Sequence, residues 1–303
     1  MTCKLCGGPT RHYLERNSFE IVRCTDCGFM FAPLPDGFNP RALYREEYFV
    51  SDAKEGAYGD YDAMWERCLR RLYAPRLLRI ECYVKVGTLL DIGCATGRFL
   101  ELAQRRRWQV AGVELEEAAR TQSSGELGVP VYASLEEVLA HGQRYDCVTM
   151  FEVLEHLDDP VTVLRQLVDL LKPTGILALA TPNCDRPGAT EGVPINIWFH
   201  PPAHLSYFNQ ASLRAIIELS GFRVIALEGL KHYSEAMAGA LTLPDRLVSV
   251  LQRLRPGKRP LPRGALGKLL KRYFANRPSV YRCERRELPI ADVFEVYAKP
   301  LRG

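Results

Sequence analysis

The stretch Leu89-Leu90-Asp91-Ile92-Gly93-Cys94-Ala95-Thr96-Gly97-Arg98-Phe99-Leu100 decides the fold of this 303-residue chain. It begins as an apolar strand, passes through small residues and continues as a helix. Small residues let the backbone come close to a ligand, and the first N–H groups of a helix point toward it. The stretch therefore predicts a strand–turn–helix unit that binds a nucleoside.

Strand-like and helix-like runs alternate around this unit. Strands are expected at 87–92, 109–114, 129–133, 145–151, 175–181, 222–228 and 291–298. Helices are expected at 98–107, 115–125, 160–171 and 212–220, with another beginning after an N-cap at Ser134. Such alternation is typical of a parallel sheet covered by helices on both faces. We therefore expect an α/β fold, with a doubly wound and mostly parallel sheet of seven strands.

Glu114 ends the next strand, 23 residues after Asp91. A carboxylate there can accept hydrogen bonds from both ribose hydroxyls, as it does in dinucleotide-binding folds. A domain for NAD or FAD is the alternative interpretation. The spacing of Gly93 and Gly97 is G-x-x-x-G, however, and differs from the G-x-G-x-x-G of such domains.

The stretch resembles the first motif of the class I S-adenosylmethionine-dependent methyltransferases, in which an acidic residue precedes two glycines separated by small residues. Ala95 stands where a middle glycine is common. The resemblance implies a Rossmann-like core, with Asp91 and Gly93 near the methionine part of the cofactor and Glu114 on the ribose. It also implies an adenine contact at Ala133 or Ser134. The cofactor residues expected in this way are Asp91, Gly93, Cys94, Ala95, Gly97, Glu114, Ser134, Phe151 and Glu152.

Two later blocks extend the resemblance to about residues 87–230 and the last strand. Residues 145–160 are similar to the fourth-strand block of the superfamily, especially of ubiquinone-type O-methyltransferases. The block lacks an Asn-Pro-Pro-Tyr type signature, which disfavours N-methylation of adenine. Residues 198–222 resemble a bacterial subfamily, many of whose members act on saccharides or secondary metabolites.

Three histidines are candidates for a catalytic base, because a hydroxyl acceptor must lose a proton. His156 follows the fourth strand, and His200 and His204 follow the fifth, where the site opens at the carboxyl ends of the strands. We rank His204 first, His156 second and His200 third. A packing role is the alternative for His156. A metal pair of His200 and His204 is disfavoured, because the sequence places no carboxylate beside them.

Four of the ten cysteines form a cluster, Cys3-x-x-Cys6 and Cys24-x-x-Cys27, and each pair is followed by a glycine. Tight turns of this kind let four thiolates converge on one zinc ion, so we expect a structural zinc ribbon with a strand at 19–23. Redox-active pairs are the alternative. The architecture is similar to that of deoxysugar C-methyltransferases and of a ribosomal-RNA guanine methyltransferase family. The ribbon is expected to shape a substrate surface or to hold a lid.

The expected domains are a zinc ribbon (1–40), a helical linker or lid (41–86), the S-adenosylmethionine-binding core (87–231), a basic helical insertion (232–288) and the last core strand (289–303). Pro75 is expected to break or kink the helix of the linker. No apolar run approaches the roughly 18 residues that span a bilayer, and no signal peptide is visible, so we expect a cytoplasmic protein.

The net charge of +4 hides an uneven distribution. Residues 246–286 hold thirteen Lys or Arg residues and one acid, so the rest of the chain carries a negative net charge. Leucines recur at helical spacing in this segment. It could meet anionic lipid, which would make the protein peripheral at the inner membrane, or form a groove for a sugar nucleotide or RNA. The alternative is a pair of cap helices with solvated charge.

The sequence thus predicts a methyltransferase that uses S-adenosylmethionine, yields S-adenosylhomocysteine and contains structural zinc. We expect a small-molecule or saccharide acceptor, with O-methylation favoured over C-methylation of a sugar. An RNA methyltransferase that uses the ribbon and the basic insertion is the alternative enzyme. A non-catalytic assembly protein with a nucleotide fold is the alternative outside enzymes.

Overall fold

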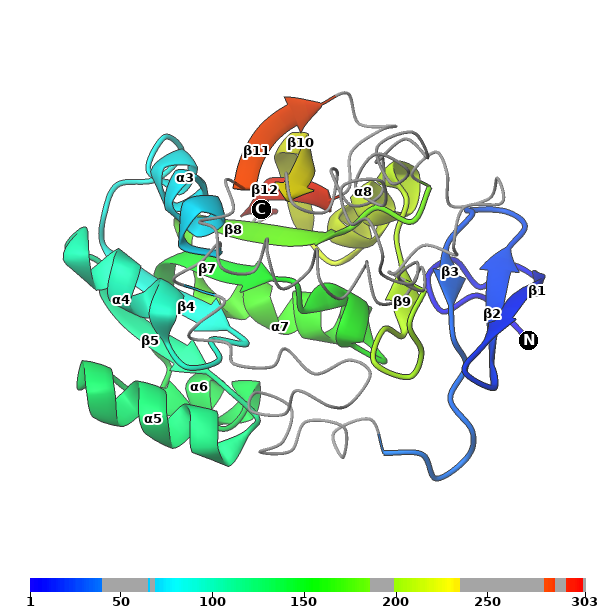
Figure 1. Ribbon diagram of the computed structural model, residues 1–303, viewed down its shortest axis with the longest axis horizontal. Helices are drawn as coiled ribbons and strands as arrows, with labels where there is room; N and C mark the ends of the chain where they lie inside the picture. The colour runs from blue at the N-terminus through cyan, green and yellow to red at the C-terminus, as the bar shows by residue number, and fades with distance from the viewer. Residues whose placement is uncertain (40–64, 66–68, 186–198, 235–280, 287–292, 302–303) are drawn as a thin grey trace, which may run out of the picture.

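Eight strands form one sheet in the computed structural model, which describes residues 1–39, 65, 69–185, 199–234, 281–286 and 293–301 (Figure 1). Their spatial order is β11–β10–β12–β8–β7–β4–β5–β6. In chain order they are β4 (Thr88–Ile92), β5 (Gln109–Val113), β6 (Val131–Tyr132), β7 (Tyr145–Phe151), β8 (Leu171–Pro182), β10 (Phe222–Ser234), β11 (Tyr281–Arg286) and β12 (Val293–Pro300). Strands β4 to β8 pair in parallel, whereas β12 runs antiparallel between β8 and β10. The expected α/β fold with a mostly parallel sheet is confirmed.

The sheet has one strand more than the seven predicted. β11 pairs antiparallel with the far end of β10, from Gly229 opposite Arg286 to Ser234 opposite Tyr281. Residues 232–234 and 281–286 were expected to be helical, and for them that prediction was wrong. The edge of β10 has unpaired backbone N–H and C=O groups, and a segment that returns to this edge can form hydrogen bonds with them. The helical prediction rested on the spacing of leucines in the basic insertion, which carries no information about strand pairing. The leucine-rich part of the basic insertion lies outside the described residues.

Six helices are described on this sheet: α3 (Arg70–Ile80), α4 (Arg98–Arg105), α5 (Glu117–Leu127), α6 (Leu135–Ala140), α7 (Pro160–Leu170) and α8 (Gln210–Leu219). The Ser134 hydroxyl accepts the N–H of Glu137, so the expected N-cap is confirmed. Pro75 lies inside α3, and the helix continues through it. Of the expected break or kink at Pro75, the break was therefore wrong, because a proline removes only one hydrogen bond, and burial of the helix compensates for it. The kink stays a prediction.

The core has two layers, because successive side chains of a strand point to opposite faces of a sheet. Leu90 of β4 and Leu177 of β8 face the apolar sides of α6, α7 and α8. Leu89 and Ile176, their neighbours in the chain, face α3 and α4. Both faces are buried, which explains why these strands read as continuous apolar runs.

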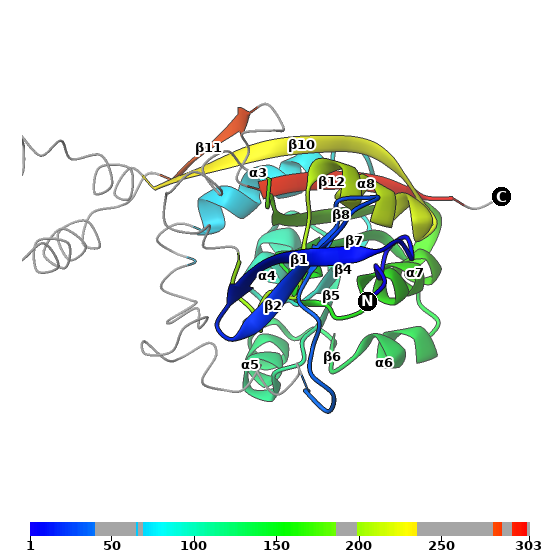
Figure 2. The ribbon, with the colours of Figure 1, turned by 90° about the vertical axis from the view of Figure 1, so that its right-hand side faces the viewer.

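A second sheet joins the N-terminal segment to the rest of the chain. It contains β1 (Thr10–Arg16), β2 (Phe19–Cys24), β3 (Met30–Phe31) and β9 (Ser206–Tyr207), in that order. We call residues 1–32 the ribbon and residues 199–209, which include β9, the acceptor loop. The ribbon hairpin lies across one end of the large sheet (Figure 2). None of the described helices combines the length and apolarity that a membrane span requires.

Candidate active site

Two buried carboxylates lie together at the carboxyl ends of β4 and β5. Asp91 accepts a hydrogen bond of 2.6 Å from the hydroxyl of Thr149 on β7. Glu114 accepts the backbone N–H groups of Ala95 (2.9 Å) and Glu116 (3.0 Å). Burial raises the pKa of Asp91 to about 7, and the nearby charge of Glu114 acts in the same direction. The two predicted residues are thus brought together as an anionic pair that favours a cationic ligand.

The turn between β4 and α4 has a left-handed backbone at three positions. Gly93, Ala95 and Gly97 have φ angles of 73°, 48° and 81°. A Cβ atom at Gly93 would lie 2.6 Å from the side chain of Val153, so this position requires glycine. Ala95 adopts a conformation that costs an L-residue energy, and strain of this kind persists where the surroundings impose it. The turn therefore accepts alanine at position 95, where a glycine is common, at the cost of backbone strain.

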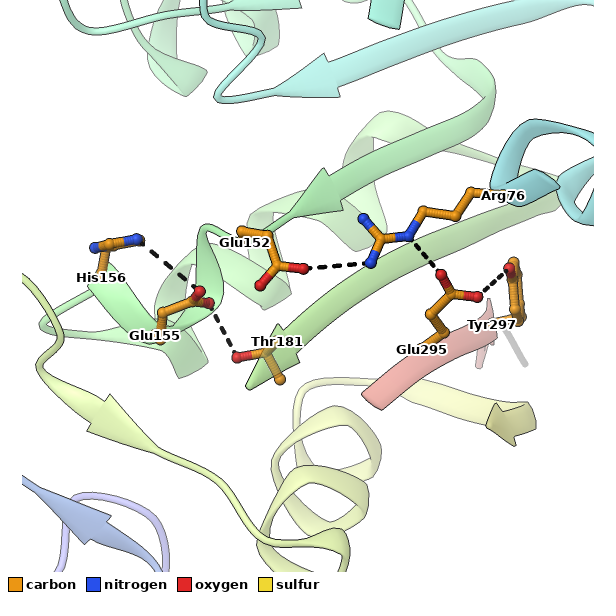
Figure 3. Close-up of polar contacts among 7 residues, drawn as sticks. All are labelled: Arg76, Glu152, Glu155, His156, Thr181, Glu295 and Tyr297. Atoms are coloured by element: carbon orange, nitrogen blue, oxygen red, sulfur yellow. Dashed lines mark hydrogen bonds and ion pairs between the residues drawn. The ribbon is translucent and has the colours of Figure 1, made fainter. Parts of the chain in front are cut away.

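Phe151 is the last residue of β7. Glu152 follows it and faces Arg76 of α3 (Figure 3). The guanidinium of Arg76 lies 4.9 Å above the ring of Phe151, and its Nη2 lies 3.3 Å from Glu152. Arg76 also pairs with the buried Glu295 of β12, which accepts the hydroxyl of Tyr297 at 3.2 Å. The Nη1 atom of Arg76 is buried without a hydrogen-bond partner. It is therefore a buried donor without a matching acceptor, a feature that is rare in folded proteins.

Glu152 has a left-handed backbone, with a φ of 55°. Burial raises the pKa of its carboxyl, whereas the charge of Arg76 opposes that shift. This is the second strained residue at the carboxyl ends of the strands, and such strain is concentrated at functional sites. Ser134, two residues after β6, uses its hydroxyl to cap α6. Its contact with adenine stays a prediction.

A second polar group lies one turn beyond Glu152, in the 3₁₀ turn Leu154–His156 (Figure 3). Glu155 is buried and accepts the hydroxyl of Thr181 at 2.9 Å. The Nδ1 atom of His156 donates to the carbonyl of Ala203 at 2.7 Å, and its Nε2 lies 3.9 Å from Glu155. Burial lowers the pKa of His156 to about 4, so the imidazole is neutral at physiological pH.

His204 joins this group from the acceptor loop. Its ring meets that of His156 edge to face, with centroids 4.7 Å apart. One ligand atom each from Glu155, His156 and His204 lies within 4.8 Å of the others. His200 is linked to the group through its carbonyl, which accepts the N–H of His204 at 2.9 Å. The structure thus brings His156 and His204 together. It also places the carboxylate of Glu155 beside them, which was not predicted from the sequence.

A family model for a methyltransferase domain matches residues 64–227, which is more than half of the chain. The chain belongs to this methyltransferase domain family. Curated relatives match a shorter part. The ubiquinone biosynthesis O-methyltransferase of Serratia proteamaculans (strain 568) is 38% identical over 104 residues, which are 32% of this chain and 43% of the relative. That of Xanthomonas axonopodis pv. citri (strain 306) is 39% identical over 126 residues, 37% of this chain and 52% of the relative. The chain thus spans about half the length of these relatives.

Among solved structures, the CcbJ methyltransferase from Streptomyces caelestis is similar over 88% of this chain and all of its own, with a TM-score of 0.53. Its sequence is 15% identical, so the likeness shows the fold alone. The part of the chain that the family model matches contains the described helices, strands β4 to β9 and the turn after Asp91.

The four clustered cysteines lie outside the matched part, in the ribbon. Their sulfur atoms are all within 4.8 Å of one another, with Cys3 to Cys27 at 3.6 Å and Cys6 to Cys24 at 3.5 Å. A tetrahedral zinc site with Zn–S bonds of about 2.3 Å has sulfur atoms about 3.8 Å apart. The four thiols therefore have the spacing that one metal ion requires.

Three residues of the methyltransferase domain and the ribbon were missed by the sequence analysis. Arg76 is an ordinary basic residue in an amphipathic run, and only the packing of α3 on β7 buries it. Glu155 directly precedes the candidate His156, and this position in the sequence could have indicated that it belongs to the site. Asn17 contacts the acceptor loop, 184 positions away in the chain, and a single sequence gives no sign of such a contact.

Proposed function

We propose that this methyltransferase domain transfers the methyl group of S-adenosylmethionine to a hydroxyl group of a small-molecule or saccharide acceptor, leaving S-adenosylhomocysteine. The observation that carries the proposal is the carboxylate pair of Asp91 and Glu114 beside the left-handed turn of Gly93. Bound S-adenosylmethionine supplies an electrophilic methyl group on a sulfonium cation. The chain must therefore hold the cation and align an acceptor with it.

The residues present fit this cofactor. Asp91 and Glu114 are buried carboxyl groups, and the charge of Glu114 disfavours ionisation of Asp91, so a sulfonium cation close to them stabilises their ionised forms. Glu114 keeps lone pairs for ribose hydroxyls while it accepts two backbone N–H groups. Nη1 of Arg76 is a buried donor suited to the carboxylate of the methionyl group.

The acceptor side is the group of Glu155, His156 and His204. A hydroxyl acceptor becomes nucleophilic as its proton leaves, and a neutral imidazole can accept that proton. The lowered pKa of His156 makes it a weak base, and its Nδ1–H is held by Ala203. This favours His204 as the base and His156 as the residue that orients it. The names of the curated relatives support an oxygen acceptor.

Zinc is the metal proposed for the ribbon, because four thiolates at tetrahedral spacing form a closed site with no open position for catalysis. Its role is structural. Thiolate ligands persist in a reducing compartment, so we propose a cytoplasmic location.

Calorimetric titration of the full chain with S-adenosylhomocysteine tests the cofactor site. Glu114→Gln removes the charge and directs an amide N–H toward a backbone donor, so we expect affinity to fall by at least tenfold, as for hydrogen bonds to charged groups. Glu117→Gln, on the next helix, is the matched control. Lack of binding by the folded wild-type protein would refute the proposal.

Methyl transfer to a panel of catechols and methyl glycosides tests the base. His204→Ala is expected to lose most of the activity while it retains affinity for S-adenosylhomocysteine. Full activity of this variant would remove His204 as the base.

A further inference from the structure

The acceptor loop is bound to the ribbon along its length. β9 pairs with β3, with Tyr207 opposite Met30 and Ser206 opposite Phe31. The N–H of Ala32 donates to the carbonyl of Leu205 at 2.9 Å, which extends the pairing by one residue. Two strand residues alone would form a weak contact, so the loop depends on further contacts for its position.

One of these contacts comes from the tip of the β1–β2 hairpin. Its two-residue turn, Asn17–Ser18, has φ angles of 49° and 62°, a left-handed turn that asparagine tolerates. The amide Nδ2 of Asn17 donates to the carbonyl of Pro201 at 2.8 Å. The backbone of Asn17 therefore adopts the conformation that the turn requires, and its side chain binds the acceptor loop.

Aromatic packing connects the loop to the cysteine knuckles. Phe29 follows Cys27 by two residues, and its carbonyl accepts the N–H of Cys24 at 2.9 Å. Its ring packs against Phe208 of the acceptor loop, with centroids 5.4 Å apart. The fold of the knuckle thus determines where Phe29 meets the loop.

The other side of the same loop builds the histidine group. Ala203 holds Nδ1 of His156, and the N–H of Leu205 donates to the carbonyl of Glu155 at 2.7 Å. His204 stands between these two residues and packs on His156. The acceptor loop contacts the ribbon on one side, and on its other side it determines the positions of the His156 and His204 imidazoles.

We propose that the ribbon is the positioning element of the acceptor side, with Asn17 as a positioning residue for His204 and His156, so that metal binding by the four thiols governs the order of the acceptor loop. The functional part of this proposal rests on the proposed methyl transfer, whereas the ordering of the loop does not. Asp91 lies on β4, and Glu114 directly follows β5. In the described sheets these two strands pair with each other, with β6 and with β7, whereas the ribbon strands β1 to β3 pair in the second sheet.

Hydrogen exchange of the full zinc-loaded chain, followed by mass spectrometry, tests the ordering without any acceptor. Asn17→Asp keeps the size of the side chain and its tolerance of the turn but replaces the N–H donor with an oxygen. Loss of one ordinary hydrogen bond corresponds to about a fivefold change, so we expect exchange in 199–209 to become about fivefold faster. Peptides from 88–114 should be unchanged.

His12→Ala is the matched control, because it removes the contact of His12 with Glu20 (3.0 Å) from the same hairpin. It should leave exchange in 199–209 as in the wild type. Removal of the metal with a chelator should accelerate exchange in the ribbon and in 199–209, and again leave 88–114 unchanged. Equal exchange in 199–209 for wild type and Asn17→Asp, or acceleration throughout the chain, would overturn the proposal.

Kinetics separate this role from a purely structural one. In Asn17→Asp we expect kcat for a hydroxyl acceptor to fall by about the same fivefold factor, with unchanged affinity for S-adenosylhomocysteine. Unchanged kcat with a loosened loop would refute the positioning of His204. Absence of cofactor binding by the wild type would instead refute the proposed methyl transfer and leave the exchange result standing.

Discussion

Arg76 of α3 pairs with Glu295 of β12 in the interior of the protein, and the same guanidinium reaches Glu152, the residue that follows β7. All three side chains are largely removed from water. An arginine from the segment before the sheet therefore joins two strands that lie on either side of β8.

Replacing Arg76 with alanine is expected to lower the free energy of unfolding by about 3–5 kcal/mol, because Glu295 is left buried without its partner. Urea denaturation measures the effect. Arg105→Ala is the control, since Arg105 is 62% exposed and pairs with Glu101 on the surface of the same domain. Its effect should stay below about 1 kcal/mol. Similar losses for both variants would contradict the assignment of Arg76 as a buried ion-pair centre.

Ala95→Gly is expected to stabilise the domain. A left-handed alanine costs roughly 1–2 kcal/mol, and glycine adds about 0.5–1 kcal/mol of chain entropy to the unfolded state. The gain should be up to about 1 kcal/mol, visible as a rise in Tm of about 2 °C. Gly97→Ala is the counterpart, because its Cβ would lie 2.8 Å from Ser123 and Leu127. Thermal unfolding that shifts in the same direction for both variants would show that strain at Ala95 is absent.

Cofactor binding should release a proton from Asp91. Burial raises the pKa of this carboxyl to about 7, so at about pH 6 it is mainly protonated before binding. A cation beside it favours the ionised form, so affinity for S-adenosylmethionine should rise up to about pH 7 and then level off. Calorimetry in buffers with different heats of ionisation measures the released proton. Heats that do not depend on the buffer, or an unchanged pH profile in Asp91→Asn, would contradict this expectation.

The ribbon should bind one metal ion per chain. Cys6→Ser removes one of the four ligands and should abolish stoichiometric zinc, as measured by elemental analysis of the purified protein. Cys82→Ser is the matched control, because Cys82 is another exposed free thiol that lies outside the cluster. Full zinc content in Cys6→Ser would exclude the four-thiolate site.

Much of the large sheet could be predicted from the sequence, because its strands and helices have strong local patterns. The strand 145–151 was predicted with its observed bounds, and the capping residue Ser134 was recognised by its chemistry. Boundaries were less certain where pairing extends an element. β10 continues to Ser234, beyond the predicted end at 228, because β11 supplies hydrogen-bond partners for its last residues.

The sequence by itself determined the α/β class, the glycine-containing turn after Asp91 and the four-cysteine pattern. These depend on periodicity, on backbone conformations open to few residues and on short ligand spacings, all of which are local. Only the tertiary structure decided that Arg76 is buried between strands, that Glu155 joins His156 and His204, and that Asn17 reaches Pro201. Each of those contacts joins separate elements that meet only when helices and ribbon pack on the sheet. A single sequence does not encode that packing in any local pattern.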